Sequence, residues 1–151
     1  MSDCFICRKQ SGEIVAPGGA VYQDDLVYAS HGTLDGRERM VLGTLFVEPR
    51  RHVPGIGDLS RPEAERVGWI TSRLAAALQA SERAEHVYTF VLGHHVPHLH
   101  VWVVPRYPGT PREYAPFRLG EWPDAPRGGE PEIRALCARV RAELARAQPT
   151  V

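Results

Sequence analysis

The sequence predicts a single α+β domain in which an antiparallel sheet carries helices on one face. Two groups of short, β-prone segments run along the chain, and an amphipathic helix follows each group. The 151 residues are enough for one domain with its own hydrophobic core, so we take residues 1–151 as one domain.

The composition narrows the class of function. Lys and Arg together number 18, as do Asp and Glu, so the formal net charge at neutral pH is zero. This balance disfavours broad adhesion to nucleic-acid polymers or membrane surfaces, although a small anionic ligand needs only a local site. No apolar run approaches the length of a membrane span, and the N-terminus lacks the apolar region of a signal peptide. We therefore expect a cytoplasmic protein.

The first strands come before residue 50. Residues 1–18 are expected to be irregular, and 19-GAVYQDDLVYASH-31 predicts a hairpin of two strands around Gln23, Asp24 and Asp25. The segment 40-MVLGTLFVEP-49 is apolar and β-prone and ends at a proline. It predicts one buried strand.

A long helix is expected over residues 60–80. Ser60 and Glu63 form a capping-box pattern, and Pro62 falls in the first turn, where proline is tolerated. Apolar residues recur at helical spacing and form one stripe: Val67, Ile70, Leu74 and Leu78.

The second group of elements fills the rest of the chain. Residues 86–93 and 98–104 predict two strands separated by a turn, and residues 105–130, rich in Pro, Gly and Arg, predict an ordered loop extension. A C-terminal helix is expected over residues 131–147, with its apolar side formed by Ile133, Cys137, Val140 and Leu144.

Chemistry-bearing residues concentrate in 98-HLHVWVV-104. Alternate residues of a strand share a face, so His98, His100 and Trp102 are expected on one face. Leu99, Val101 and Val103 are then expected to point into the core. Histidines also occur on half-exposed sheet faces without a special role, but convergent imidazoles favour catalysis or metal binding.

These residues carry a resemblance to a known family. The segment 98-HLHVWVVPR-106 resembles the signature of the histidine triad (HIT) superfamily of nucleotide hydrolases and transferases, His-φ-His-φ-His-φ-φ with φ apolar, often followed by Pro-Arg. Only the third histidine differs, since Trp102 stands there. Four further segments resemble their family counterparts in order and spacing: Cys4-x-x-Cys7, 21-VYQDDLVYASH-31, 44-TLFVEPRRHV-53 with the following helix, and 93-GHHVP-97.

The resemblance implies a HIT-like fold and a nucleotidyl hydrolase or transferase similar to the dinucleoside polyphosphate hydrolases. His100 would be the nucleophile that attacks the α-phosphate of a nucleotide, with His98 and Trp102 beside it in the catalytic motif. A neutral imidazole can form such a covalent nucleotidyl intermediate. Alternatives are a phosphorylase or transferase with an acceptor other than water, a nucleotide-binding protein with weak or lost catalysis, and a zinc-stabilised interaction domain without a nucleotide site.

The resemblance also implies substrate contacts. Gly93, His94 and His95 would bind the phosphate, although exposure in a turn explains the two histidines equally well. The hairpin residues Leu26, Tyr28 and His31 would contact the nucleoside, with His31 near the ribose hydroxyls. Leu26 and Tyr28 are equally compatible with an ordinary hairpin.

A metal site is suggested by Cys4 and Cys7. Their spacing lets two thiolates reach one zinc ion, but a structural site needs four ligands. In zinc-bearing relatives the positions of His52 and His98 complete the tetrahedron, so the resemblance implies one structural zinc per chain on the N-terminal segment 1–18. A redox pair or an unmetallated pair of thiols is the alternative. The resemblance further implies a homodimer.

Trp102 marks the departure from the signature. The third histidine of the triad assists the leaving group, whereas an indole has one N–H donor and cannot shuttle a proton. Superfamily branches with Gln at this position tend to be transferases or phosphorylases. We therefore expect Trp102 in place of the third histidine to disfavour simple hydrolysis more than nucleotidyl chemistry.

Overall fold

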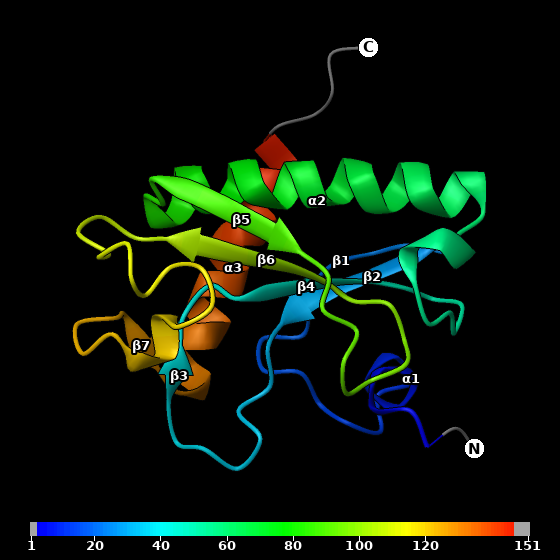
Figure 1. Cartoon of the computed structure of the whole chain (residues 1–151), viewed down its shortest axis with the longest axis horizontal. Helices are drawn as coiled ribbons and strands as arrows, with labels where there is room; N and C mark the ends of the chain where they lie inside the picture. The colour runs from blue at the N-terminus through cyan, green and yellow to red at the C-terminus, as the bar shows by residue number, and fades with distance from the viewer. Residues whose placement is uncertain (1–2, 147–151) are drawn as a thin grey trace.

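A computed structural model describes residues 3–146 and confirms the α+β class. Its main sheet has five antiparallel strands in the order β1-β2-β4-β6-β5. Helices α2 and α3 cover one face of this sheet, and the short helix α1 lies on the other (Figure 1). The strands of the main sheet are β1 (Ala20–Gln23), β2 (Val27–His31), β4 (Leu45–Pro49), β5 (His86–Phe90) and β6 (Val101–Arg106).

The core lies between the sheet and the two long helices, α2 (Arg61–Glu82) and α3 (Glu130–Arg146). Strands β2, β4 and β6 send alternate apolar side chains toward the helices, as period-2 patterning requires. The predicted apolar stripes of α2 and α3 pack against these side chains. The central buried residues are Val27, Ala29, Leu45, Val47, Val103, Ile70, Leu74, Leu78, Ile133 and Val140.

The strand register decides what lies on the opposite face. Strand β4 pairs with β6 so that Val47 faces Val101 and Phe46 faces Trp102. Since Val47 and Val101 point into the helix-covered core, Phe46 and Trp102 point away from it. The sheet therefore presents a second, chemically distinct face toward α1.

Helix α2 begins as predicted. Ser60 is its N-cap, and its backbone N–H donates a 2.8 Å hydrogen bond to Glu63 Oε2, which closes the capping box. The helix ends at Glu82 and is capped by Arg83, which adopts a left-handed conformation (φ 58°). Residue 147, where the C-terminal helix was predicted to end, lies outside the described residues. Within residues 3–146, no helix is both long enough and apolar enough to cross a membrane.

Two N-terminal predictions were wrong. Residues Phe5–Gln10, expected to be irregular, form α1. The single strand expected over residues 40–49 is split into β3 (Met40–Val41) and β4 by a turn at Gly43. Gly43 has φ 89°, and a Cβ there would lie 2.7 Å from Tyr107 Oη, so this close approach requires glycine.

The extension after β6 is tied to the body by a second sheet. Strand β3 pairs with β7 (Arg127–Gly128), which lies far along the chain. The extension also contains the 3₁₀ turn η2 (Leu119–Glu121), and a similar turn, η1 (Ile56–Asp58), precedes α2. In Figure 1, β3 and β7 lie at one end of the molecule, on the side of the sheet opposite α2.

Candidate active site and metal centre

Cys4, Cys7, His52 and His98 form one group whose ligand atoms all lie within 4.8 Å of one another. Cys7 Sγ is 3.4 Å from the Nδ1 atoms of both histidines, and Cys4 Sγ is 3.5 Å from His98 Nδ1. A tetrahedral zinc ion with ordinary Zn–S and Zn–N bonds places sulfur and nitrogen ligands about 3.6 Å apart. The donor set and its spacing therefore fit a structural zinc ion.

The surroundings of His98 orient it for metal binding. Its ring is fully buried, and the second nitrogen, Nε2, donates a 2.8 Å hydrogen bond to the Pro49 carbonyl oxygen. This bond leaves Nδ1 as the ligand atom, the arrangement that metal-bound histidines usually show. Burial also lowers the pKa of His98, which favours the neutral, metal-binding form.

These ligands come from three parts of the chain. Helix α1 carries Cys7 and is capped by Cys4, His52 follows strand β4, and His98 lies just before β6. The predicted strand over residues 98–104 starts later than expected, at Val101. His98 and His100 therefore lie in the irregular segment just before β6, where the backbone N–H of Leu99 donates to the Val53 carbonyl oxygen at 2.6 Å.

A cavity of about 660 Å³ opens on the sheet face that bears α1. Both His100 and Trp102 line it, so the structure brings these two predicted catalytic residues together. The other walls come from α1, from residues 32–44, from the end of β5 and from the extension after β6.

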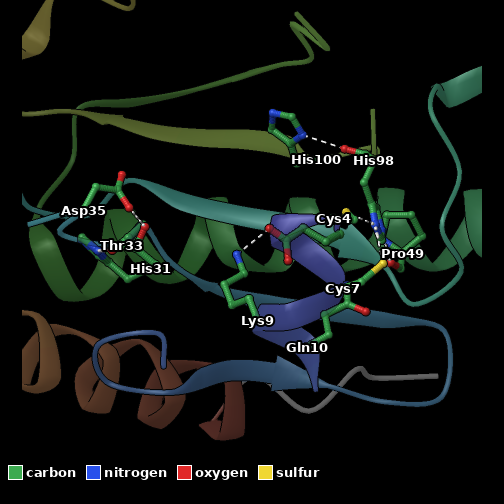
Figure 2. Close-up of polar contacts among 12 residues, drawn as sticks. Cys4, Cys7, Lys9, Gln10, His31, Thr33, Asp35, Pro49, His98 and His100 are labelled. Carbon is green, nitrogen blue, oxygen red and sulfur yellow. Dashed lines mark hydrogen bonds and ion pairs between the residues drawn. The ribbon is translucent and has the colours of Figure 1, made fainter. Parts of the chain in front are cut away.

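His100 is held in one tautomer. Its Nδ1 lies 2.8 Å from the His98 carbonyl oxygen, which can only accept, so Nδ1 carries the proton (Figure 2). In the neutral ring, this hydrogen bond leaves the lone pair on Nε2. A neutral imidazole with its lone pair at a cavity is suited to act as a nucleophile or as a general base.

A buried ion pair lies on the same face and was not anticipated from the sequence. Lys9 Nζ donates to Glu48 Oε1 at 2.5 Å, and both side chains are at most 3% exposed. Both residues line the cavity. The register of β4 and β6, continued by one residue, places Glu48 opposite His100. A charged residue within the apolar run 44-TLFVEP-49 was the signal that could have revealed it.

Trp102 is packed between aromatic rings. Its ring stacks on Phe90 with centroids 5.5 Å apart, meets the edge of Phe46 at 4.5 Å, and lies 6.2 Å from the ring of His100. Its indole N–H is buried and has no hydrogen-bond partner among residues 3–146. The ring therefore forms an apolar wall beside His100.

His31 does not reach the cavity. It is fully buried, its Nε2 accepts a 2.9 Å hydrogen bond from the Gly43 N–H, and its Nδ1 donates to the Gly32 carbonyl oxygen. Both ring nitrogens are thus occupied by the backbone. As placed here, the ring has no free donor or acceptor, so a ribose contact through His31 would require one of these backbone bonds to break. That contact stays a prediction.

The other two predicted nucleoside contacts also lie away from the cavity lining. Leu26 borders a separate shallow hollow with Trp69, on the surface of α2. Tyr28 is buried on the sheet, with the Arg50 guanidinium 5.4 Å and the Lys9 ammonium 6.0 Å from its ring. Neither side chain is among the cavity walls in the described structure.

The predicted phosphate loop borders the cavity only through its apolar residues. Leu92 and Val96 line the cavity, while His94 and His95 are exposed beside it, with ring centroids 5.8 Å apart. Gly93 adopts φ 64°, a conformation that glycine favours and that turns the chain. The phosphate-binding role of Gly93, His94 and His95 stays a prediction.

Comparisons with known proteins agree with this architecture. The HIT domain matches residues 13–109. A Zn-bound histidine triad family protein from Mycobacterium smegmatis is similar over 95% of this chain and 94% of its own, with 21% identity and a TM-score of 0.70. A hypothetical histidine triad nucleotide-binding protein from Sulfolobus tokodaii strain 7 is similar over 95% and 93%, with 17% identity and a TM-score of 0.72.

A third solved structure, a Hit-like protein from Bartonella henselae, is similar over 93% of this chain and 96% of its own, with 19% identity and a TM-score of 0.67. A search of curated proteins finds no match. At these identities the structural likenesses show a shared fold, and the domain match covers well over half of the chain. The chain therefore belongs to the HIT domain family.

Proposed function

We propose that this protein is a nucleotidyl hydrolase or transferase that attacks the α-phosphate of a nucleotide, such as a dinucleoside polyphosphate, through a covalent intermediate on His100. One observation carries this proposal. The His98 carbonyl oxygen accepts the Nδ1 proton of His100 at 2.8 Å, and His100 borders a cavity of about 660 Å³. That volume is typical of small-molecule sites.

The reaction divides into two displacements. His100 Nε2 attacks the α-phosphorus and forms a P–N bond, while the bond from phosphorus to the bridging oxygen breaks and its electron pair leaves with the departing group. Water or another acceptor then attacks the same phosphorus, losing a proton to solvent, while the P–N bond breaks and its electron pair returns to His100 Nε2. The hydrogen bond to the His98 carbonyl stabilises the cationic ring of the intermediate.

We propose that zinc serves a structural role. Cys4, Cys7, His52 and His98 would hold it, and four protein ligands leave no open position for substrate or water. The ion would fasten α1 to the approach of β6, two residues before His100. By this route it would hold the His98 carbonyl in place for the nucleophile.

Covalent trapping tests the role of His100. The wild-type protein is incubated with a nucleotide labelled at the α-phosphate and denatured at high pH, because a P–N bond to imidazole is acid-labile. We expect labelled protein from the wild type and from His86→Ala, a control on the exposed surface of β5, but none from His100→Ala. An undiminished adduct in His100→Ala would exclude the covalent role.

A second candidate function is nucleotide binding with weak or lost catalysis. The packing of Trp102 between Phe46 and Phe90 favours it, because the wall beside the nucleophile then lacks an acid. Turnover separates the candidates: tight nucleotide binding by calorimetry without adduct or product supports the binding protein. We also propose a homodimer, which sedimentation equilibrium tests directly.

A further inference from the structure

One half of the cavity beside His100 is built from two segments that lie far apart in the sequence. Residues 39–41 contribute one wall, and the extension after β6 contributes Pro116, Phe117, Leu119, Gly120 and Arg127. The β3–β7 sheet joins these segments, with Met40 paired to Gly128 and Val41 paired to Arg127. This half lies mostly outside the match to the HIT domain, which ends at residue 109.

Charge is unevenly distributed in this cavity. Its charged lining residues are Lys9, Arg37, Arg39, Arg127, Asp35 and Glu48. Lys9 pairs with Glu48 at 2.5 Å, and Arg37 pairs with Asp35 at 3.4 Å. Arg39 and Arg127 then remain without a carboxylate partner within residues 3–146. Two uncompensated positive charges at one cavity favour an anionic ligand, although the whole chain has no net charge.

The two arginines are held in place by the backbone. Arg39 Nη2 donates to the Arg127 carbonyl oxygen at 2.7 Å, which fastens it across the β3–β7 sheet. Arg127 donates to the Gly120 carbonyl oxygen at 2.6 Å and to the Trp122 carbonyl oxygen at 3.1 Å. These contacts with neutral acceptors orient the guanidinium groups without cancelling their charge.

An aromatic side chain completes this half of the cavity. Phe117 is 67% exposed, and its ring meets the edge of Phe90 with centroids 4.9 Å apart. Phe90 in turn stacks on Trp102, so the aromatic surface runs from the mouth of the cavity to the wall beside His100. Such a surface can cover the face of a planar base.

Trp102 limits which groups can leave. An amine must be protonated as it departs, and the indole N–H beside His100 is not acidic enough to transfer its proton. A phosphate oxygen departs as a stable anion without protonation. Arginines near the departing oxygen can stabilise the negative charge that develops there.

Resting on the proposed function, we propose that Arg39, Arg127 and Phe117 form a leaving-group subsite for a nucleoside phosphate joined to the attacked phosphorus by a phosphoanhydride. As His100 Nε2 bonds to phosphorus, the P–O bond of the anhydride breaks and its electron pair stays on the departing phosphate oxygen. No proton is required at this step. Arg39 and Arg127 bind the phosphates, and Phe117 packs against the base.

The test compares two substrates of the same nucleophile. The leaving group of a dinucleoside tetraphosphate is a nucleoside phosphate, which fills the subsite. The leaving group of a nucleoside 5′-phosphorofluoridate is fluoride, which needs no proton and carries neither a base nor a phosphate for the subsite to bind. We expect Arg39→Gln and Phe117→Ala to lower kcat/KM for the tetraphosphate about tenfold or more. Both variants should retain the wild-type rate with the fluoridate within about twofold.

Matched variants separate binding from folding. Arg118→Gln removes an exposed arginine of the same extension, which pairs with Glu121 and does not line the cavity, and should leave both rates unchanged. Arg39→Lys keeps the charge and should recover part of the lost rate. Equal effects of Arg39→Gln on both substrates, or none on the tetraphosphate, would overturn the subsite while leaving the role of His100 intact. If the wild type reacts with neither substrate, both the function and the subsite are wrong.

Discussion

Lys9 and Glu48 form a buried ion pair, with Nζ and Oε1 2.5 Å apart, on the cavity face of the sheet. Helix α1 provides the lysine and strand β4 the carboxylate. Burial raises the pKa of Glu48, and the Lys9 ammonium opposes that effect. The pair therefore joins α1, which provides two of the four zinc ligands, to the strand beside His100.

Removing one partner of this pair should be more harmful than removing both. Lys9→Met leaves an uncompensated buried carboxylate and is expected to lower the free energy of unfolding by about 3–5 kcal/mol. The double variant Lys9→Met/Glu48→Leu replaces the pair by apolar side chains and should recover most of that loss. Urea unfolding measures both, with zinc content checked in each variant; equal losses in the two would show that the charges are not coupled.

Zinc should bind at one ion per chain and stabilise the fold. Cys4→Ser and His52→Ala each remove one of four ligands and should abolish stoichiometric zinc in the purified protein, measured by elemental analysis. Cys137→Ala is the matched control, since that thiol belongs to α3 and is buried in the core on the opposite face of the sheet from α1. A chelator should lower the Tm of the wild type and of Cys137→Ala. Full zinc in Cys4→Ser would contradict this ligand set.

His31 should affect stability rather than nucleotide affinity. Burial lowers the pKa of His31, so the native state keeps the ring neutral while the unfolded state takes up a proton near the ordinary value of 6.5. The stability that this neutral ring confers is therefore lost as pH falls below 6.5. His31→Gln cannot titrate, so its unfolding free energy should fall less than that of the wild type between pH 7 and pH 5. A large loss of nucleotide affinity in this variant would instead support a contact between His31 and the ribose.

Glu63 should account for part of the acid denaturation. The Arg51 guanidinium and the N–H and hydroxyl groups of Ser60 lower the pKa of Glu63 from 4.5 to about 2. Stability from this depressed carboxyl is complete above pH 4.5 and is lost as pH falls toward 2. Glu63→Gln should cost about 1–2 kcal/mol at neutral pH and flatten the dependence between these limits. Parallel acid-unfolding curves for variant and wild type would contradict this role.

Trp102→His should widen the range of leaving groups. The new imidazole would lie beside His100 on the same face and could protonate a departing amine. We expect the variant to hydrolyse a nucleoside phosphoramidate on the order of tenfold to a hundredfold faster than the wild type. Trp102→Phe, which keeps the aromatic stack on Phe90 but has no acid, is the control. A similar gain in Trp102→Phe would show that space, not proton transfer, limits the wild type.

Much of the site could be predicted because its chemistry is concentrated in short motifs. Cys4-x-x-Cys7 and 98-HLHVWVV-104 marked the candidate thiols and imidazoles before any coordinates. Resemblance to a family added the ligand roles of His52 and His98 and the proposed role of His100 as nucleophile. Residues whose role depends on the direction of a side chain could not be placed from the sequence. His31 follows the alternation of β2 into the core, where Gly43 and Gly32 occupy both of its nitrogens.

The sequence by itself determined the fold class, the two long helices and the residue types of the site, because local periodicity and capping are encoded in neighbouring residues. Tertiary structure alone decided that Lys9 meets Glu48, that α1 closes one side of the His100 cavity, and that Arg39 and Arg127 come together through the β3–β7 sheet. These pairs join segments 39 and 88 residues apart. Strand register and chain packing bring such distant residues together. Neither can be deduced from the pattern of neighbouring residues in the sequence.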